Sequence, residues 1–301
     1  MDKKIKSLSV FRKNVLPKSP STDDHEGEFL VSESHYEPVY GRLVSETQFG
    51  ADGIPEQIMK LEYNQNGFLT GEELFDSDGT TLEKKTWEPD AKGRIFREYV
   101  HYADGSADRI DYAYDEKGRI FKKERFDEDG ELESAEHFEY ENDHLIRETV
   151  LNAEGETSSE TLYTYDENAN LTEVMSDNPE EEIWFRKVYR YDEAGHRLSV
   201  TTFNREGDPV QRVSFENDEK GRPTQIIEEN RRQKNTVQME YDERGEILFQ
   251  EEKDLNGEVT NRIERIFDQE GLLAESYILV RNFQRGISRN YTLRNKYTFF
   301  D

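Results

Sequence analysis

The sequence predicts an all-β protein: an elongated, twisted antiparallel sheet of about nine tandem β-hairpin repeats of roughly 25 residues, with non-repeat ends. Three observations predict it. A glycine-containing turn motif returns along the chain at a nearly constant step, and a second turn lies midway between successive copies. Between the turns, apolar and polar residues alternate. Together these features are typical of strands joined by tight turns.

The first turn motif reads Tyr-Asp-Glu-Lys-Gly-Arg-Ile at residues 114–120, and its copies follow at steps of 24 to 26 residues. The Asp side chain of such a turn accepts a backbone N–H, and the Gly adopts the positive φ that closes it. This is the chemistry of a type I turn followed by a glycine bulge. His144 and Ala169 replace the Gly, so we expect these two turns to be strained or shifted by one residue, with Asn170 able to take the left-handed position in the second.

The second turn lies 12 residues after most first-type turns, as at 126–130 and 203–207, and is eroded near 178–179 and 231–233. Removing both kinds of turn leaves some eighteen strands of about 8–10 residues. Paired neighbour to neighbour in an open sheet, they would extend roughly 85 Å.

Two aromatic columns are expected on one face of this sheet. The sixth and fourth residues before each first-type glycine are mostly aromatic, and the residue between them is mostly polar. Residues two apart share a face of a strand, so the aromatic side chains of successive repeats line up. We interpret the columns as cross-strand packing, and alternatively as a ligand-binding row. The candidate residues are Trp87, Tyr112, Tyr114, Tyr140, Tyr163, Tyr165, Tyr189 and Tyr191.

The composition favours a fold that buries only a narrow apolar stripe. Hydrophobic residues make up 33% of the chain and charged residues 36%, which is lean for a compact globular domain, whereas 12% aromatic residues argue against disorder. The chain has no cysteine, which excludes disulfides and thiolate chemistry. No apolar run is long enough for a secretory signal or a transmembrane helix, so we expect a cytoplasmic protein.

The charge is unevenly distributed. The net charge of the chain is −27, yet residues 1–22 hold six Lys/Arg against one acid, and residues 281–301 hold five against one. The intervening chain therefore carries about −36. Such a charge repels phosphate backbones and anionic lipids, so we expect neither nucleic acid nor membrane as a partner. It favours solubility and, as a sharper hypothesis, attraction of a protein with a basic surface.

The two ends are expected to differ from the repeat domain at 41–280. Residues 1–40 are predicted to be a flexible basic arm that leads into the sheet. Residues 281–301 are basic and aromatic, and we expect either a cap over the last open edge or a docking tail that could bind a second copy. The candidate docking residues are Arg281, Arg285, Arg289 and Arg294.

The Tyr-Asp-x-x-Gly-Arg-Ile/Leu motif resembles the YD repeat of the RHS family over about residues 41–280. The resemblance implies a long sheet of repeated hairpins and a bacterial source. This chain lacks the self-cleavage motif and toxin tail of that family and is too short to enclose a cargo, so toxicity is not implied. A weaker similarity is to the MORN-variant repeats of antitoxin-like proteins, which are richer in Gly and Trp.

No motif for catalysis, metal binding or a cofactor is present in the sequence. The six histidines are dispersed, and the Asp-x-Asp-Gly turns place Gly fourth where a calcium loop needs it sixth. We therefore expect no enzyme activity and no cofactor. The leading hypothesis is a non-catalytic scaffold that presents an acidic sheet to a protein partner. The alternatives are an immunity or antitoxin-type protein that covers a basic toxin, and a carbohydrate-binding module that uses the aromatic columns.

Overall fold

The computed structural model describes residues 4–14, 27–282 and 285–301, and these residues form 22 β-strands. The chain divides into two compact units, which are described separately. Unit 1 comprises residues 1–107, 241–250 and 260–301, and unit 2 comprises residues 108–240 and 251–259. Among the described residues, no helix is long and apolar enough to cross a membrane.

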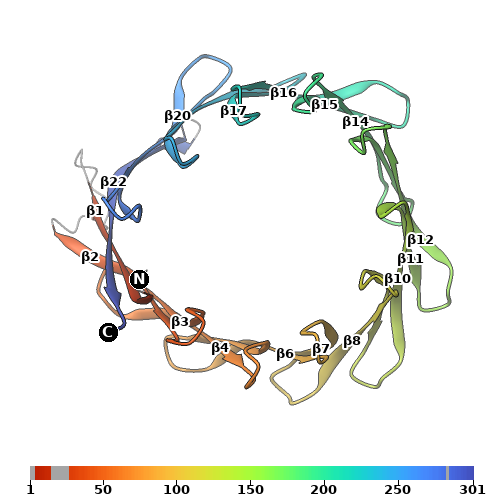
Figure 1. Cartoon of the computed structure of the whole chain (residues 1–301), viewed down its shortest axis with the longest axis horizontal. Coiled ribbons are helices and arrows are strands. Elements are labelled where there is room, and N and C mark those ends of the chain that lie inside the picture. The colour runs from red at the N-terminus through yellow and green to blue at the C-terminus, as the bar shows by residue number, and fades with distance from the viewer. Residues whose placement is uncertain (1–3, 15–26, 283–284) are drawn as a thin grey trace. The chain divides into compact units, whose positions relative to one another are not determined.

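Unit 1 contains the strands from both ends of the chain (Figure 1). They are β1 (Ile5–Asn14), β2 (Glu28–Tyr36), β3 (Leu43–Phe49), β4 (Pro55–Tyr63), β5 (Leu69–Asp76), β6 (Thr81–Pro89), β7 (Ile95–His101), most of β20 (Val259–Phe267), β21 (Leu273–Asn282) and β22 (Ile287–Phe299).

Unit 2 contains the central strands except for two end residues, Ala107 and Tyr241, and its consecutive strands from β8 to β18 pair antiparallel. They are β8 (Ala107–Tyr114), β9 (Ile120–Phe126), β10 (Leu132–Glu141), β11 (His144–Asn152), β12 (Thr157–Tyr165), β13 (Leu171–Asn178), β14 (Ile183–Tyr191), β15 (Arg197–Phe203), β16 (Pro209–Asn217), β17 (Pro223–Asn230) and β18 (Lys234–Tyr241). The strand β19 (Ile247–Lys253) has residues in both units.

The first-type turns have the predicted geometry. In the turn between β8 and β9, the Asp115 N–H donates to the Arg119 carbonyl at 2.8 Å, and the Gly118 N–H donates to the Asp115 carbonyl at 3.0 Å. Gly118 has a φ of 85°, and the strand register shifts beside Tyr114. A type I turn followed by a glycine bulge is therefore confirmed here.

The two first-type turns without glycine adopt the left-handed backbone conformation in different ways. Ala169 itself adopts a φ of 65°, so the expectation that Asn170 would take the left-handed position is wrong. The other turn is shortened: Glu141 pairs directly with His144, and Asn142 and Asp143 have φ values of 49° and 70°. Two consecutive left-handed residues are typical of a type I′ hairpin, which confirms the predicted shift by one residue.

The predicted open, elongated sheet is wrong, although the all-β class is right. β1 pairs with β2 on one side and with β22 on the other, and Figure 1 shows β1 and β22 side by side. Ile5 is the partner of Phe299, and Asn14 is the partner of Tyr291. The sheet is thus closed by its first and last strands, and neither strand is a free edge. The repeat period did not reveal this closure because the closing strands lie outside the repeat.

The N-terminal segment contains strands that we did not predict. Residues 5–14 and 28–36, within the segment expected to be a flexible arm, form β1 and β2, while residues 1–3 and 15–26 lie outside the described residues. Most of the expected cap or docking tail forms β22, which is hydrogen-bonded on one side to β21 and on the other to β1. It covers the edge of β21 and also pairs with β1, so it closes the sheet.

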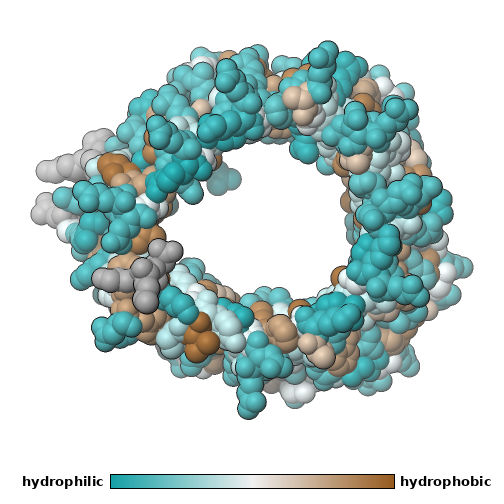
Figure 2. All heavy atoms as spheres, in the orientation of Figure 1, coloured by the Kyte–Doolittle hydropathy of each residue, from teal (hydrophilic) through white to brown (hydrophobic). Residues whose placement is uncertain are grey.

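Few side chains are fully shielded from solvent. Of the apolar residues that the structure describes, Ile110, Ala135 and Val174 are buried, and all three lie in unit 2. Hydrophilic residues dominate the surface seen in Figure 2, with hydrophobic residues in small patches between them. Strand ladders, turn hydrogen bonds and half-buried side chains therefore carry the stability, in agreement with the lean apolar composition.

Candidate interaction surfaces

Tyrosines of one aromatic column tie several repeats to the repeat that precedes them. The hydroxyl of Tyr140 donates to the Ile120 carbonyl at 2.8 Å, and that of Tyr165 donates to the Leu145 carbonyl at 3.0 Å. Tyr191 makes the equivalent bond to Leu171, and in unit 1 Tyr63 bonds to Leu43. In each case the acceptor lies twenty residues earlier, just after the left-handed residue of the preceding turn. We call this series the tyrosine ladder.

A side chain from the preceding turn packs on several rings of the ladder. The Arg119 guanidinium lies 4.2 Å from the ring centre of Tyr140, and the His144 ring lies 4.7 Å from that of Tyr165. Both Arg119 and His144 immediately follow a left-handed residue. Tyr140 and Tyr165 are therefore each held by a hydrogen bond at the hydroxyl and by a contact at the face of the ring.

The candidate column residues all lie on strands and are half-buried. Trp87 is on β6 in unit 1, and the tyrosines are on β8, β10, β12 and β14 of unit 2. Burial and the nearby Glu148 carboxylate raise the pKa of Tyr163 to about 12, and its hydroxyl bonds that carboxylate at 3.1 Å. The hydroxyls of Tyr140, Tyr163, Tyr165 and Tyr191 thus have partners within the chain.

The turn aspartates are engaged in local hydrogen bonds. A backbone N–H and the side chain of Arg119 hold the pKa of the Asp115 carboxyl below its usual range. The Arg222 side chain and backbone lower the pKa of Asp218 in the same way. These carboxylates are ionised and have partners within their own turns. The acids at the middle of these two turns, Glu116 and Glu219, are exposed instead.

Three neighbouring second-type turns of unit 2 form a surface that we call the acidic edge, defined as residues 127–131, 153–156 and 179–182. They connect β9 to β10, β11 to β12, and β13 to β14, so they lie at the same end of the strands. The edge has no Lys or Arg. Its exposed acids are Glu128, Asp129, Glu131, Glu154, Glu156, Glu180, Glu181 and Glu182.

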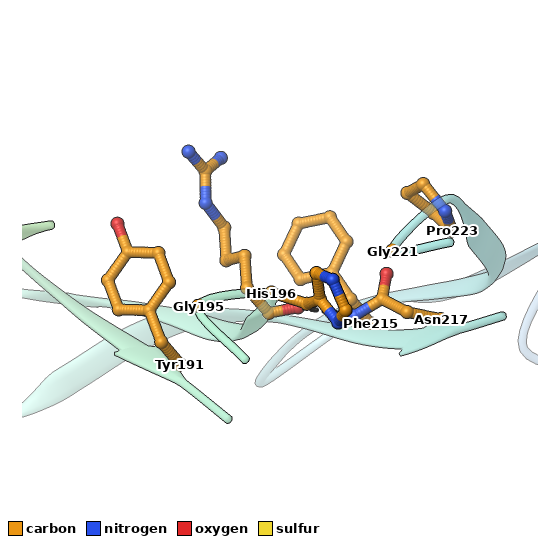
Figure 3. A pocket seen from close by; sticks show the side chains of 8 residues that line it. Tyr191, Gly195, His196, Phe215, Asn217, Gly221 and Pro223 are labelled. Atoms are coloured by element: carbon orange, nitrogen blue, oxygen red, sulfur yellow. Dashed lines mark hydrogen bonds between the residues drawn. The ribbon is translucent and has the colours of Figure 1, made fainter. Parts of the chain in front are cut away.

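A pocket of about 330 Å³ lies in unit 2, at the first-type turns that follow β14 and β16 (Figure 3). Tyr191, Phe215, Pro223 and Asn217 line it, together with His196, Arg197 and the glycines of the two turns. His196 is anchored by Asp192, whose carboxylate lies 3.1 Å from the imidazole Nδ1. Sequence reasoning did not single out this pocket, although Asn217 visibly interrupts the tyrosine column.

The candidate docking arginines lie at the end of β21, in the turn that follows and on β22. Arg294 forms a two-bond ion pair with Glu28, at 2.6 and 2.8 Å, and its guanidinium lies 5.0 Å from the ring centre of Phe11. Arg281 and Arg289 are paired in the ladder with Ser288 and Val280, and the Arg285 N–H donates to Asn282. Arg294 therefore helps to join β22 to the strands of the other end. Docking of this segment onto a second copy stays a prediction.

Within the described residues, no group of three or more His, Asp or Glu side chains is arranged to hold a metal ion.

The fold and its surfaces define the class of the chain: an all-β protein of tandem β-hairpin repeats. No family model matches the chain, and no curated protein matches it. A crystal structure of TcdB2-TccC3-Cdc42 is similar over 87% of this chain, with 12% identity and a TM-score of 0.29, and this chain covers only 18% of that one. A porin-like protein from Bacteroides uniformis is similar over 98% of both chains, with 9% identity and a TM-score of 0.32. Similarities this low do not define a function.

Proposed function

We propose that the protein is a non-catalytic scaffold that binds a protein partner with a basic surface through the acidic edge. The observation that carries the proposal is the repetition of exposed acids, without a basic residue, on three successive turns. Two strands separate each turn from the next, which sets them about 10 Å apart. This spacing is close to the screening length at physiological ionic strength, so neighbouring turns act jointly on a cation between them.

The charge of the unit supports the same proposal. In unit 2, acidic residues outnumber Lys and Arg by about 20. Two arginines of unit 2 are already paired with acids outside the edge: Arg125 with Asp108 and Glu133, and Arg205 with Asp177. The edge itself contains no Lys or Arg, so a positively charged protein is steered towards it.

The proposal includes a YD-type repeat as the building block. The Tyr-Asp-x-x-Gly motif and the geometry of its turn support this assignment, because each motif residue has a defined role. The Tyr bonds the preceding repeat, the Asp closes the turn and the Gly takes positive φ. A basic toxin protein is one partner that would satisfy the chemistry of the acidic edge.

The test compares two variants with the same change of charge. In the edge variant, Glu128, Glu131, Glu154, Glu156 and Glu181 are replaced by Gln. In the control, the exposed glutamates of first-type turns at the other ends of the strands are replaced instead: Glu116, Glu141, Glu167, Glu193 and Glu219.

Affinity capture from the native source, followed by titration of the captured basic protein, is the measurement. We expect the edge variant to weaken binding at least tenfold, about 1.4 kcal/mol, and the control to change it far less. Binding of the intact protein should also fall with salt. Equal losses in the two variants would mean that net charge, and not the edge, attracts the partner, and would overturn the proposal.

A further inference from the structure

The pocket in unit 2 lies where the tyrosine ladder is interrupted. Asn217 stands at the column position that Tyr140, Tyr165 and Tyr191 occupy in other repeats. Its side-chain amide donates to the Arg197 carbonyl at 2.9 Å, which is the equivalent of the tyrosine bond twenty residues back. Asn therefore keeps the hydrogen bond of the ladder but supplies no ring. The space of the ring remains as part of the pocket.

The residue that would stack on that ring is still present. His196 immediately follows a left-handed glycine, as His144 follows the left-handed Asp143, and His144 stacks on Tyr165 at a ring distance of 4.7 Å. The His196 imidazole is held by Asp192 and lies close to Gly221, where an added Cβ would meet it at 2.3 Å. A packed, anchored imidazole thus lines a pocket without the aromatic partner that the equivalent histidine has.

The other walls suit a planar ring with an anionic substituent. The rings of Tyr191, Phe215 and Pro223 stand on the same side of the sheet in Figure 3, around the labelled Asn217. The Arg197 guanidinium lies 5.4 Å from the Tyr189 ring centre and 6.0 Å from that of Phe215. Within the described part of the chain, no carboxylate lies within ion-pairing distance of Arg197, whereas Arg222, in the next first-type turn, is paired with Asp218.

We propose that this pocket binds an aromatic carboxylate, with the ring in the place of the missing tyrosine, stacked on His196, and the carboxylate paired with Arg197. The inference is independent of the acidic edge, which lies at the opposite ends of the strands. A ligand of this size with one ion pair is expected to bind with a Kd on the order of 1 mM.

The probe is 4-hydroxyphenylacetate, whose ring is that of a tyrosine side chain. Titration is followed by NMR through the ring protons of His196, assigned by comparison with a His196→Gln variant. We expect saturable shifts for the intact protein. In Asn217→Tyr the new ring should fill the pocket, so the shifts should be lost while the protein stays folded. Absence of binding to the intact protein, or full binding to Asn217→Tyr, would overturn the proposal.

Two matched comparisons separate the ring from the charge. The uncharged 4-hydroxyphenylacetamide should bind the intact protein several-fold more weakly than the acid, and Arg197→Gln should remove that difference. Tyr165→Asn should open an equivalent space beside His144. The residue equivalent to Arg197 is there Leu145, which has no guanidinium. Any binding in this new space should therefore show no preference for the acid over the amide. A preference for the acid that survives in Arg197→Gln would contradict the assigned role of Arg197.

Discussion

The hydroxyl of Tyr140 lies 2.8 Å from the carbonyl oxygen of Ile120, which belongs to the preceding repeat. Ile120 begins β9 directly after the turn, where the register shifts and the regular ladder is interrupted. The tyrosine therefore supplies a donor to a carbonyl beside a bulge. The motif tyrosine is thus a structural bond between repeats, and burial raises its pKa above the usual value.

Tyr140→Phe should destabilise the protein by about 1 kcal/mol, because the Ile120 carbonyl loses its side-chain donor while the ring contacts remain. Urea denaturation at pH 7 measures the change in the free energy of unfolding. Tyr40→Phe is the control, since Tyr40 is 57% exposed and should be near neutral. If Tyr140→Phe lowers the free energy of unfolding no more than the control does, the tyrosine ladder does not contribute to stability.

Ala169→Gly should stabilise the protein by about 0.5–1 kcal/mol, because Ala169 has a φ of 65° and pays a steric cost that Gly does not. The matched change in the opposite direction is Gly118→Val, at a φ of 85°, which should cost about 1–3 kcal/mol. Both are read from denaturation midpoints. Effects of the same sign in both variants would mean that backbone strain does not govern these turns.

Asp115→Asn should lower stability near neutral pH and lose its effect in acid. Asn retains the acceptor for the backbone N–H groups, as Asn152 does in its own turn, but cannot form an ion pair with Arg119. The pKa of Asp115 is lower in the folded protein, so its contribution is complete above about pH 4 and is lost as the pH falls through the folded value. Thermal unfolding of both proteins between about pH 2.5 and 7 tests this. A constant difference across that range would contradict the pKa assignment.

Deletion of residues 287–301 should unfold the protein or cause it to aggregate, because it exposes the edges of both β1 and β21. Sedimentation and circular dichroism provide the readout. A monomeric, fully folded truncated protein would mean that the closing strand is dispensable.

A circular permutant should fold, because the pairing of β1 with β22 brings the ends of the chain together. A short linker joins Asp301 to Lys4, and the chain is opened in the turn at Gly155. We expect a β-sheet spectrum like that of the parent protein, with a moderate loss of stability. A permutant that cannot fold, while a protein nicked at Gly155 remains folded, would contradict this expectation.

Local features were predictable from the sequence and the closure was not. Turn geometry depends on a few neighbouring residues, so Asp115 and Gly118 indicated their turn correctly. Pairing of Ser7 with Thr298, whose hydroxyls lie 2.6 Å apart across 291 residues, has no local signal, and neither strand carries the repeat motif. The only sign of the pocket in the sequence was Asn217 at a position where other repeats have a tyrosine. The pocket itself could be recognised only once the structure showed where the His196 ring lies.

The pairing of β1 with β22 also sets the order in which the protein can be completed during translation. At about 5–20 residues per second, the partner of β1 leaves the ribosome some 15–60 s after β1 itself. Throughout that time one side of β1 offers unpaired backbone groups to any other nascent strand. Charged side chains, lysine above all, protect such edges. The basic residues in and beside β1 would protect its unpaired edge until β22 is synthesised. They are Lys4, Lys6, Arg12 and Lys13.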